Sequence, residues 1–182
     1  MKIRPREEAV IKATGKGWDD WFRLLDDAGM HHRDHRTIAA RVKTSGCNKA
    51  WWQQTITVEY ERARGLRDVH QRFDGHYEIG RTRTLQLSAD DAVEMVRDES
   101  RRRMWLDVEL NPPAQKVISG NPYFIFNWPD QRTTLHVVIE AKGSAKSTLT
   151  VVHRDLSGPA ECEEKKAFWT AVLDKLKSGI SF

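Results

Sequence analysis

Hydrophobic and polar positions in the second half of the chain follow first the spacing of strands and then that of a helix. Alternating apolar residues predict strands over 83–87, 123–128, 135–141 and 149–153. A broad apolar face predicts a closing helix over about 160–180; its members are Phe168, Trp169, Val172, Leu173, Leu176 and Ile180. A helix laid across an antiparallel sheet leaves a gap that can hold an apolar ligand, which favours binding over catalysis.

The first third of the chain has helical spacing instead. Apolar residues recur over 7–66 in a way that predicts a small helical bundle. Thr14 is expected to cap a helix that begins near Gly17, and Gly29 is expected to end it. A short helix over 36–43 should follow, with Asp34 near its start.

A third helix is predicted over 50–63, before Gly65. Ile56, Val58 and Tyr60 also alternate with polar residues, so a strand is the alternative in this segment. The pattern is too long for an ordinary strand, and we therefore favour the helix.

The whole pattern predicts an α+β protein with two domains, a helical bundle over 1–70 and, over 71–182, an antiparallel sheet with a long C-terminal helix. Ser88 is expected to cap a helix that follows the first strand. Polar Thr134, His136 and Glu140 alternate with the apolar residues of their strand and should face water.

Charge and cysteine usage narrow the class of protein. The net charge is only +4 and is spread over both halves, which argues against a strongly basic nucleic-acid arm. Cys47 and Cys162 are far apart and predict free thiols in a reducing cytosol.

The first ten residues lack the apolar run of a signal peptide, and no stretch is apolar enough to span a membrane. We therefore expect a cytoplasmic protein.

Tryptophan is unusually abundant, with seven residues. Core packing explains most of them, because a small domain gains stability by burying large side chains. Stacking on a base or a ligand is the alternative. Adjacent Trp51 and Trp52 cannot both point into one core from a helix, so one of them should lie at an edge.

Several paired motifs are spread along the N-terminal segment: Thr14-Gly15-Lys16, Trp18, Trp21, Leu25-Asp26, the stretch 35–39, Trp51-Trp52, Gln54, Tyr60-Glu61 and Arg64-Gly65. In these residues the segment resembles an uncharacterised bacterial family, domain of unknown function 4287. The resemblance covers about 60 residues, implies a small helical domain and supplies no known chemistry.

The succession of a short helix, a glycine and a longer helix also suggests a helix-turn-helix that binds DNA. Arg62, Arg64 and Arg67 would then contact the nucleic acid near the end of the last helix. Glu59 and Glu61 on the same helix argue against this hypothesis, so structural packing is favoured over DNA binding.

The cluster His31, His32, Asp34 and His35 has spacings that a metal site could use. It falls in a predicted loop without a cysteine in register, and metal sites need three or four convergent ligands. We expect a solvated loop, with no metal and no cofactor.

Short motifs are also spread along the C-terminal half: Leu85, Leu87-Ser88-Ala89, Trp105-Leu106, Lys142-Gly143, Lys146-Ser147, Val151, His153, Leu156, Phe168-Trp169, Leu173 and Leu176. With these motifs, and above all in its order of elements, the chain over about residues 80–182 resembles the START-like (SRPBCC) helix-grip superfamily, in the branch of activators of heat-shock-protein ATPase. The segment between Leu110 and Tyr123 is shorter than is usual in that family. The resemblance implies a helix-grip domain that binds an apolar small molecule or lipid.

Three signals of chemistry are weak. Residues 143–148 resemble the end of a phosphate-binding loop but lack its upstream glycine and lie between strands. His153 and Asp155 could transfer a proton, although a surface or edge position is the simpler interpretation. The run 101–103, three arginines, is most simply a solvated helix face, with an anion or partner contact as the alternative.

The sequence therefore favours a non-enzymatic protein that binds an apolar small molecule, a lipid or a protein partner, with no membrane contact. A ligand-responsive DNA-binding regulator is the second hypothesis, and an enzyme that acts on a hydrophobic substrate is the third. The predicted ligand-binding residues are Phe124, Phe126, Trp128, Val137, Ile139, Trp169 and Val172. Whether their domain holds a cavity or a solid core is left open.

Overall fold

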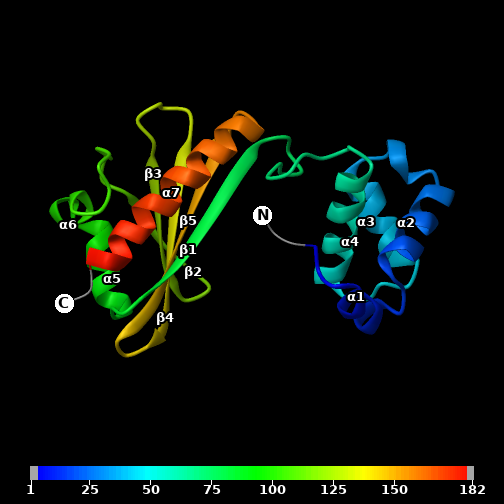
Figure 1. Ribbon diagram of the computed structural model, residues 1–182, viewed down its shortest axis with the longest axis horizontal. Helices are drawn as coiled ribbons and strands as arrows, with labels where there is room; N and C mark the ends of the chain where they lie inside the picture. The colour runs from blue at the N-terminus through cyan, green and yellow to red at the C-terminus, as the bar shows by residue number, and fades with distance from the viewer. Residues whose placement is uncertain (1–3, 180–182) are drawn as a thin grey trace. The chain divides into compact units, whose positions relative to one another are not determined.

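The computed structural model describes residues 4–179 of the 182-residue chain. The chain divides into two compact units, Met1–Val69 and His70–Phe182. Each unit has its own cluster of buried hydrophobic side chains. We therefore describe the two units one at a time (Figure 1).

The N-terminal unit is helical. Its elements are α1 (Glu7–Thr14), α2 (Trp18–Asp27), the short 3-10 helix η1 (Met30–His32), α3 (His35–Thr44) and α4 (Ala50–Ala63). The predicted third helix is thus confirmed, and the alternative of a strand in this segment is wrong. Asp34 caps α3 by accepting a hydrogen bond from the Thr37 amide at 2.8 Å.

The start of α2 differs from the prediction. Thr14 does not cap it; Thr14 is the last residue of α1, and its hydroxyl donates to the carbonyl oxygen of Val10 at 2.8 Å. The cap is Gly17, beside which Glu7 Oε1 accepts a hydrogen bond from the Trp18 amide at 3.1 Å. A Cβ atom on Gly17 would lie 2.2 Å from that carboxylate oxygen. Glycine is needed here because the acidic side chain of α1 replaces an ordinary cap.

Aromatic side chains join α2 and α4. The ring centroids of Trp18 and Trp52 are 6.3 Å apart, and those of Phe22 and Tyr60 are 5.8 Å apart. The Tyr60 hydroxyl then donates to Asp26 Oδ1 at 2.8 Å. Most of the tryptophans are buried, as expected; these are Trp18, Trp21, Trp105, Trp128 and Trp169. Trp51 is the exposed member of the adjacent pair.

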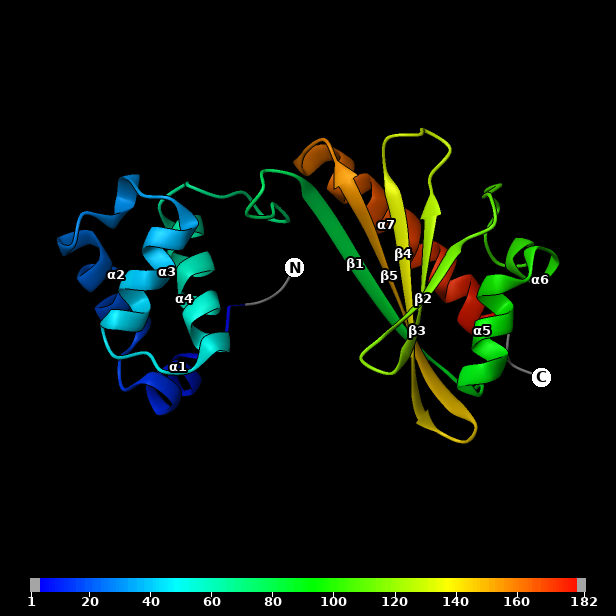
Figure 2. The same ribbon diagram turned by 180° about the vertical axis from the view of Figure 1, so that it is seen from behind.

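The C-terminal unit is a five-stranded antiparallel sheet with helices on one face. Its strands occur in the order β1-β5-β4-β3-β2. They are β1 (Tyr77–Leu85), β2 (Ala114–Ile118), β3 (Asn121–Asn127), β4 (Thr134–Gly143) and β5 (Lys146–Leu156), and the helices are α5 (Ala89–Arg97), α6 (Glu99–Arg103) and α7 (Pro159–Gly179). Figures 1 and 2 show α7 crossing one face of the sheet. The predicted α+β fold, an antiparallel sheet with a long C-terminal helix, is confirmed.

Two strands differ from the prediction. β1 begins at Tyr77 rather than near residue 83. The prediction missed its first half because the polar side chains of Arg81 and Arg83 obscure the alternation of apolar residues. They bond to α7, with Arg81 Nε 3.1 Å from Thr170 Oγ1 and Arg83 Nε 2.7 Å from Asp174 Oδ1. β2 was not predicted at all. All five of its residues are exposed at the edge of the sheet, so it has no alternation of buried and polar positions.

The run of arginines is not simply a solvated face. Ser88 caps α5 as predicted, by accepting from the Asp91 amide at 3.1 Å. Arg102, however, is only 3% exposed, and its guanidinium donates to the carbonyl oxygens of Val96 at 2.9 Å and Leu110 at 3.3 Å. Burial lowers the pKa of Arg102. Arg102 therefore joins the end of α5 to the segment before β2.

Candidate functional site

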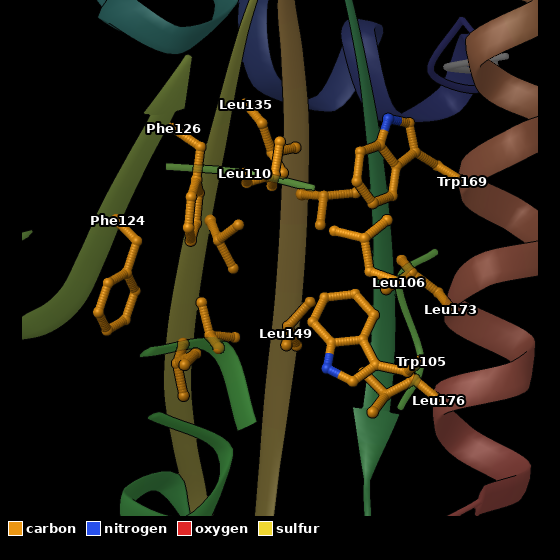
Figure 3. Close-up of a cluster of buried hydrophobic side chains, with 14 of the residues drawn as sticks. Trp105, Leu106, Leu110, Phe124, Phe126, Leu135, Leu149, Trp169, Leu173 and Leu176 are labelled. Carbon is orange, nitrogen blue, oxygen red and sulfur yellow. The ribbon is translucent and has the colours of Figure 1, made fainter. Parts of the chain in front are cut away.

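The predicted ligand-binding residues come from β3, β4, α7 and the turn after β3, and all belong to the hydrophobic cluster between the sheet and the helices. Figure 3 shows Phe124 and Phe126 on the sheet and Trp169 on α7 around the leucines between them. Phe124, Phe126, Val137, Ile139 and Trp169 are essentially fully buried. Ligand binding by these side chains stays a prediction, and a ligand that reaches them must displace packed core contacts.

The end of this cluster near Trp128 is less closed. Trp128 is 8% exposed, and Phe168 and Val172 are partly buried. The Trp128 ring contacts those of Phe168 and Trp169, with centroids 5.8 Å and 5.6 Å away. The ammonium of Lys165 lies 5.3 Å from the Trp128 ring centroid. This aromatic rim, defined as Trp128, Lys165, Phe168 and Val172, is where the predicted residues meet solvent.

A buried polar chain lies beside the aromatic rim. Trp169 Nε1 donates to His153 Nδ1 at 3.0 Å, and His153 Nε2 lies 2.9 Å from Thr133 Oγ1. The Thr133 hydroxyl donates to Asp130 Oδ2 at 2.8 Å. An indole is only a donor, and the single hydroxyl proton of Thr133 is used on Asp130. His153 is therefore neutral, with its proton on Nε2.

Burial and the surrounding charges keep His153 in that neutral form. Desolvation, followed by the positive charge of Lys165, lowers the pKa of His153 to about 4. Although burial would raise the pKa of Asp130, hydrogen bonds from the backbone amides of Thr133 and Arg132 offset it and lower that pKa. The prediction of a surface or edge position for His153 is wrong: the ring is fully buried and bonds to a helix.

A second polar chain, with a tyrosine in place of the tryptophan, lies on the opposite face of the sheet. The Thr134 hydroxyl donates to Asp155 Oδ2 at 3.1 Å and lies 3.1 Å from His136 Nε2, so Nε2 carries the proton of this imidazole. His136 Nδ1 therefore accepts from the Tyr123 hydroxyl, 2.5 Å away. Burial, and next the positive charge of Arg154, lowers the pKa of His136 to about 4. The predicted water-facing position of His136 is thus only partly correct, because the ring is half-buried.

These chains favour positioning over acid–base chemistry. An imidazole whose pKa is about 4 is a weak base at neutral pH, where a general base works best with a pKa near the working pH.

Among residues 4–179, no group of three or more His, Cys, Asp or Glu side chains could hold a metal ion. Residues 143–146 form the turn of the β4–β5 hairpin, and no helix follows that a phosphate loop would need.

The three arginines of the DNA-binding hypothesis each pair with a carboxylate of their own unit. Arg62 pairs with Glu59 at 2.7 Å, and Arg67 Nε lies 2.5 Å from Glu61 Oε2. Arg64 Nε donates to Asp26 at 2.9 Å. These pairs occupy side chains that a phosphate backbone would otherwise contact. DNA binding stays a prediction that this geometry does not favour.

The predicted histidine loop is partly helical. His31 and His32 lie in η1 and are exposed, with ring centroids 4.0 Å apart. His35 instead begins α3, where its Nδ1 lies 2.9 Å from Glu61 Oε1. The histidines of the predicted cluster therefore lie in two different environments, His31 and His32 at the surface and His35 against Glu61.

Sequence reasoning missed Asp130, Thr133 and Lys165. Asp130 accepts hydrogen bonds from the backbone amides of Arg132 and Thr133, which is the arrangement of an Asx turn. The order Pro129-Asp130 before a strand is a turn signal that could have placed this carboxylate just before the start of β4. Lys165 gives no such local signal.

No helix in the described residues 4–179 combines the length and the apolar character that crossing a membrane requires. No family model matches the chain, and no curated protein matches it. The resemblance of the N-terminal segment to domain of unknown function 4287 is therefore not confirmed.

Solved structures resemble more than half of the chain. A START superfamily protein from Mycobacterium smegmatis has 12% identity and a TM-score of 0.46 over 58% of this chain and 97% of its own. An AHSA1-like protein from Rhizobium etli has 13% identity and a TM-score of 0.42 over 56% of this chain and 80% of its own. The di-domain aromatase/cyclase BexL has 10% identity and a TM-score of 0.42 over 56% of this chain and 45% of its own. At these values the likenesses decide nothing about a ligand, and the fold rests on the strand order and helices described above.

Proposed function

We propose that the C-terminal unit is a non-enzymatic binding module for an apolar small molecule or lipid. The supporting observation is the aromatic rim, which is continuous with the buried cluster of the unit and only partly covered. Trp128 and Phe168 offer large, rigid apolar surfaces that a flexible ligand can contact at low entropic cost. Phe124, Phe126, Val137, Ile139 and Trp169 belong to the buried cluster that adjoins the rim, and Val172 is part of the rim itself.

The polar groups near the rim support binding rather than catalysis. The hydrogen-bonding positions of both His153 nitrogens are taken by Trp169 and Thr133. A proton acceptor for a substrate would have to give up one of these buried bonds, which costs free energy. The His153 chain instead fixes α7 against the sheet beside the rim.

A titration of the full chain tests the proposal. Fatty acids, fatty alcohols and aromatic amphiphiles are added while tryptophan emission and the melting temperature are followed. We expect at least one class to change the emission and raise the melting temperature, because a ligand that binds only the native state stabilises it.

A matched pair of variants locates the response. Trp128→Phe should abolish most of the emission change, whereas Trp51→Phe should leave it intact because Trp51 is an exposed residue of the helical unit. Failure of every compound to shift either signal would refute small-molecule binding and leave a protein partner as the better hypothesis.

A further inference from the structure

Lys165 carries a positive charge that is mostly buried and has little negative charge close to it. Its side chain is 16% exposed, and its ammonium lies over the Trp128 ring. The carboxylate paired with it, Glu164, is 3.9 Å away and 75% exposed. An ion pair of that length and exposure contributes little. Lys165 thus places a positive charge at the aromatic rim without a close acidic partner among residues 4–179.

The neighbouring cations Lys166 and Arg132, in contrast, each pair with a carboxylate. Lys166 Nζ lies 3.0 Å and 2.9 Å from the two carboxylate oxygens of Glu163. Arg132 donates to Glu161 Oε1 at 2.6 Å and to the carbonyl oxygen of Asp155 at 2.7 Å. Lys165 is also the charge that most strongly opposes protonation of His153, so its field reaches into the buried cluster. An anion at the rim would therefore meet a cation whose paired carboxylate, Glu164, is distant and exposed.

The spacing of α7 adds an apolar path next to this cation. Lys165, Phe168 and Val172 are three and four residues apart, so they form one row along the helix. The row that starts at Lys166 is different: its Thr170 is bonded to Arg81 of β1. The first row is free of such bonds and leads from a charge to apolar surface.

We infer that the rim binds an amphiphile with an anionic headgroup, the headgroup at Lys165 and the apolar tail along Phe168, Val172 and Trp128. This inference rests on the proposed function and adds the charge of the ligand. The pairing is favourable because the Lys165 side chain is already largely desolvated, with its ammonium over the Trp128 ring.

Isothermal titration calorimetry on the full chain tests this with three probes of equal tail length, below their micelle concentrations: decanoate, 1-decanol and decyltrimethylammonium. We expect decanoate to bind about tenfold more tightly than 1-decanol, the effect of one hydrogen bond to a charged group. Decyltrimethylammonium should bind most weakly. The preference for decanoate should shrink as salt is raised.

Lys165→Met keeps an apolar stem over Trp128 and removes the charge, so decanoate should then bind no better than 1-decanol. Lys166→Met is the matched control and should keep the preference, because the Lys166 charge is already paired with Glu163. Melting temperatures of both variants are compared with that of the unaltered chain. Since the three probes are ranked first on the unaltered chain, the charge preference is measured even where a variant fails to fold.

The outcomes separate the two ideas. Equal affinity for decanoate and 1-decanol in the unaltered chain, or a preference that survives Lys165→Met, overturns the anionic headgroup and leaves the apolar site standing. No heat from any of the three probes, together with no response to the wider panel of apolar compounds, overturns the proposed function and this inference with it.

Discussion

Acid should destabilise the C-terminal unit through His153 as the pH falls below about 6.5. The perturbation is His153→Gln, which removes the titrating ring. In the folded chain the pKa of His153 is about 4, because burial and Lys165 disfavour the charged form, against an ordinary value of 6.5. Protonation would also oppose the hydrogen bond from Trp169, since Nδ1 would become a donor.

The sign and size of the pH effect on stability follow from the difference in proton binding between the folded and the unfolded chain. Above pH 6.5 the ring is neutral in both the folded and the unfolded chain, so its contribution to stability is fully present. Between pH 6.5 and 4 the unfolded chain takes up the proton first, and stability is lost. The unfolded and folded pKa values of His153 differ by about 2.5, which corresponds to roughly 3 kcal/mol of stability in full. Roughly 2 kcal/mol of this stability should be lost between pH 7 and pH 4.5.

The assay is urea unfolding at pH 7.5, 6.5, 5.5 and 4.5. The unaltered chain should lose free energy of unfolding steadily over this range, and His153→Gln should flatten the curve at the cost of lower stability at pH 7.5. His32→Gln is the matched control, since His32 is an exposed histidine of η1. Each unit has its own core, so the transition that His153→Gln shifts identifies the C-terminal unit.

An unchanged pH dependence in His153→Gln would refute the assignment of this coupling to the buried ring. His136 provides a second, smaller contribution in the same window, because its pKa is also about 4 but its ring is only half-buried. Arg154, Arg72 and Lys116 face it with positive charge and Asp155 with negative charge. Residual slope in the His153 variant should therefore become smaller on adding His136→Gln, and part of it should remain because burial also lowers the pKa of His70.

Three further substitutions test the packing by urea or thermal unfolding at pH 7.5. Ser147→Ala should stabilise the chain by about 1 kcal/mol, because the buried Ser147 hydroxyl has no hydrogen-bond partner within residues 4–179; a loss of stability would contradict this. Arg102→Met should cost roughly 2–4 kcal/mol because the carbonyls of Val96 and Leu110 lose their donor, and a cost below 1 kcal/mol would count against it. Phe168→Ala should cost only roughly 1–3 kcal/mol, less than for a fully buried ring, so a larger loss would show that the rim is closed.

The sequence determined the features that depend on near neighbours in the chain. Helical spacing placed α4 and α7, and the short polar side chains of Asp34 and Ser88 marked two helix starts, because a cap needs only the next few backbone amides. Alternation placed β3, β4 and the middle of β5 for the same reason, since one face of each strand is buried.

The tertiary structure decided which polar residues are buried and with whom they pair. His153 meets Thr133 only when β4 pairs with β5, and meets Trp169 only when α7 packs on the sheet. Arg102 finds the carbonyl oxygen of Leu110 only when the segment before β2 folds back. The edge strand β2 has no buried face and so no pattern to detect. Burial of a charge or an imidazole depends on partners far along the chain, whereas spacing and caps are properties of the local sequence.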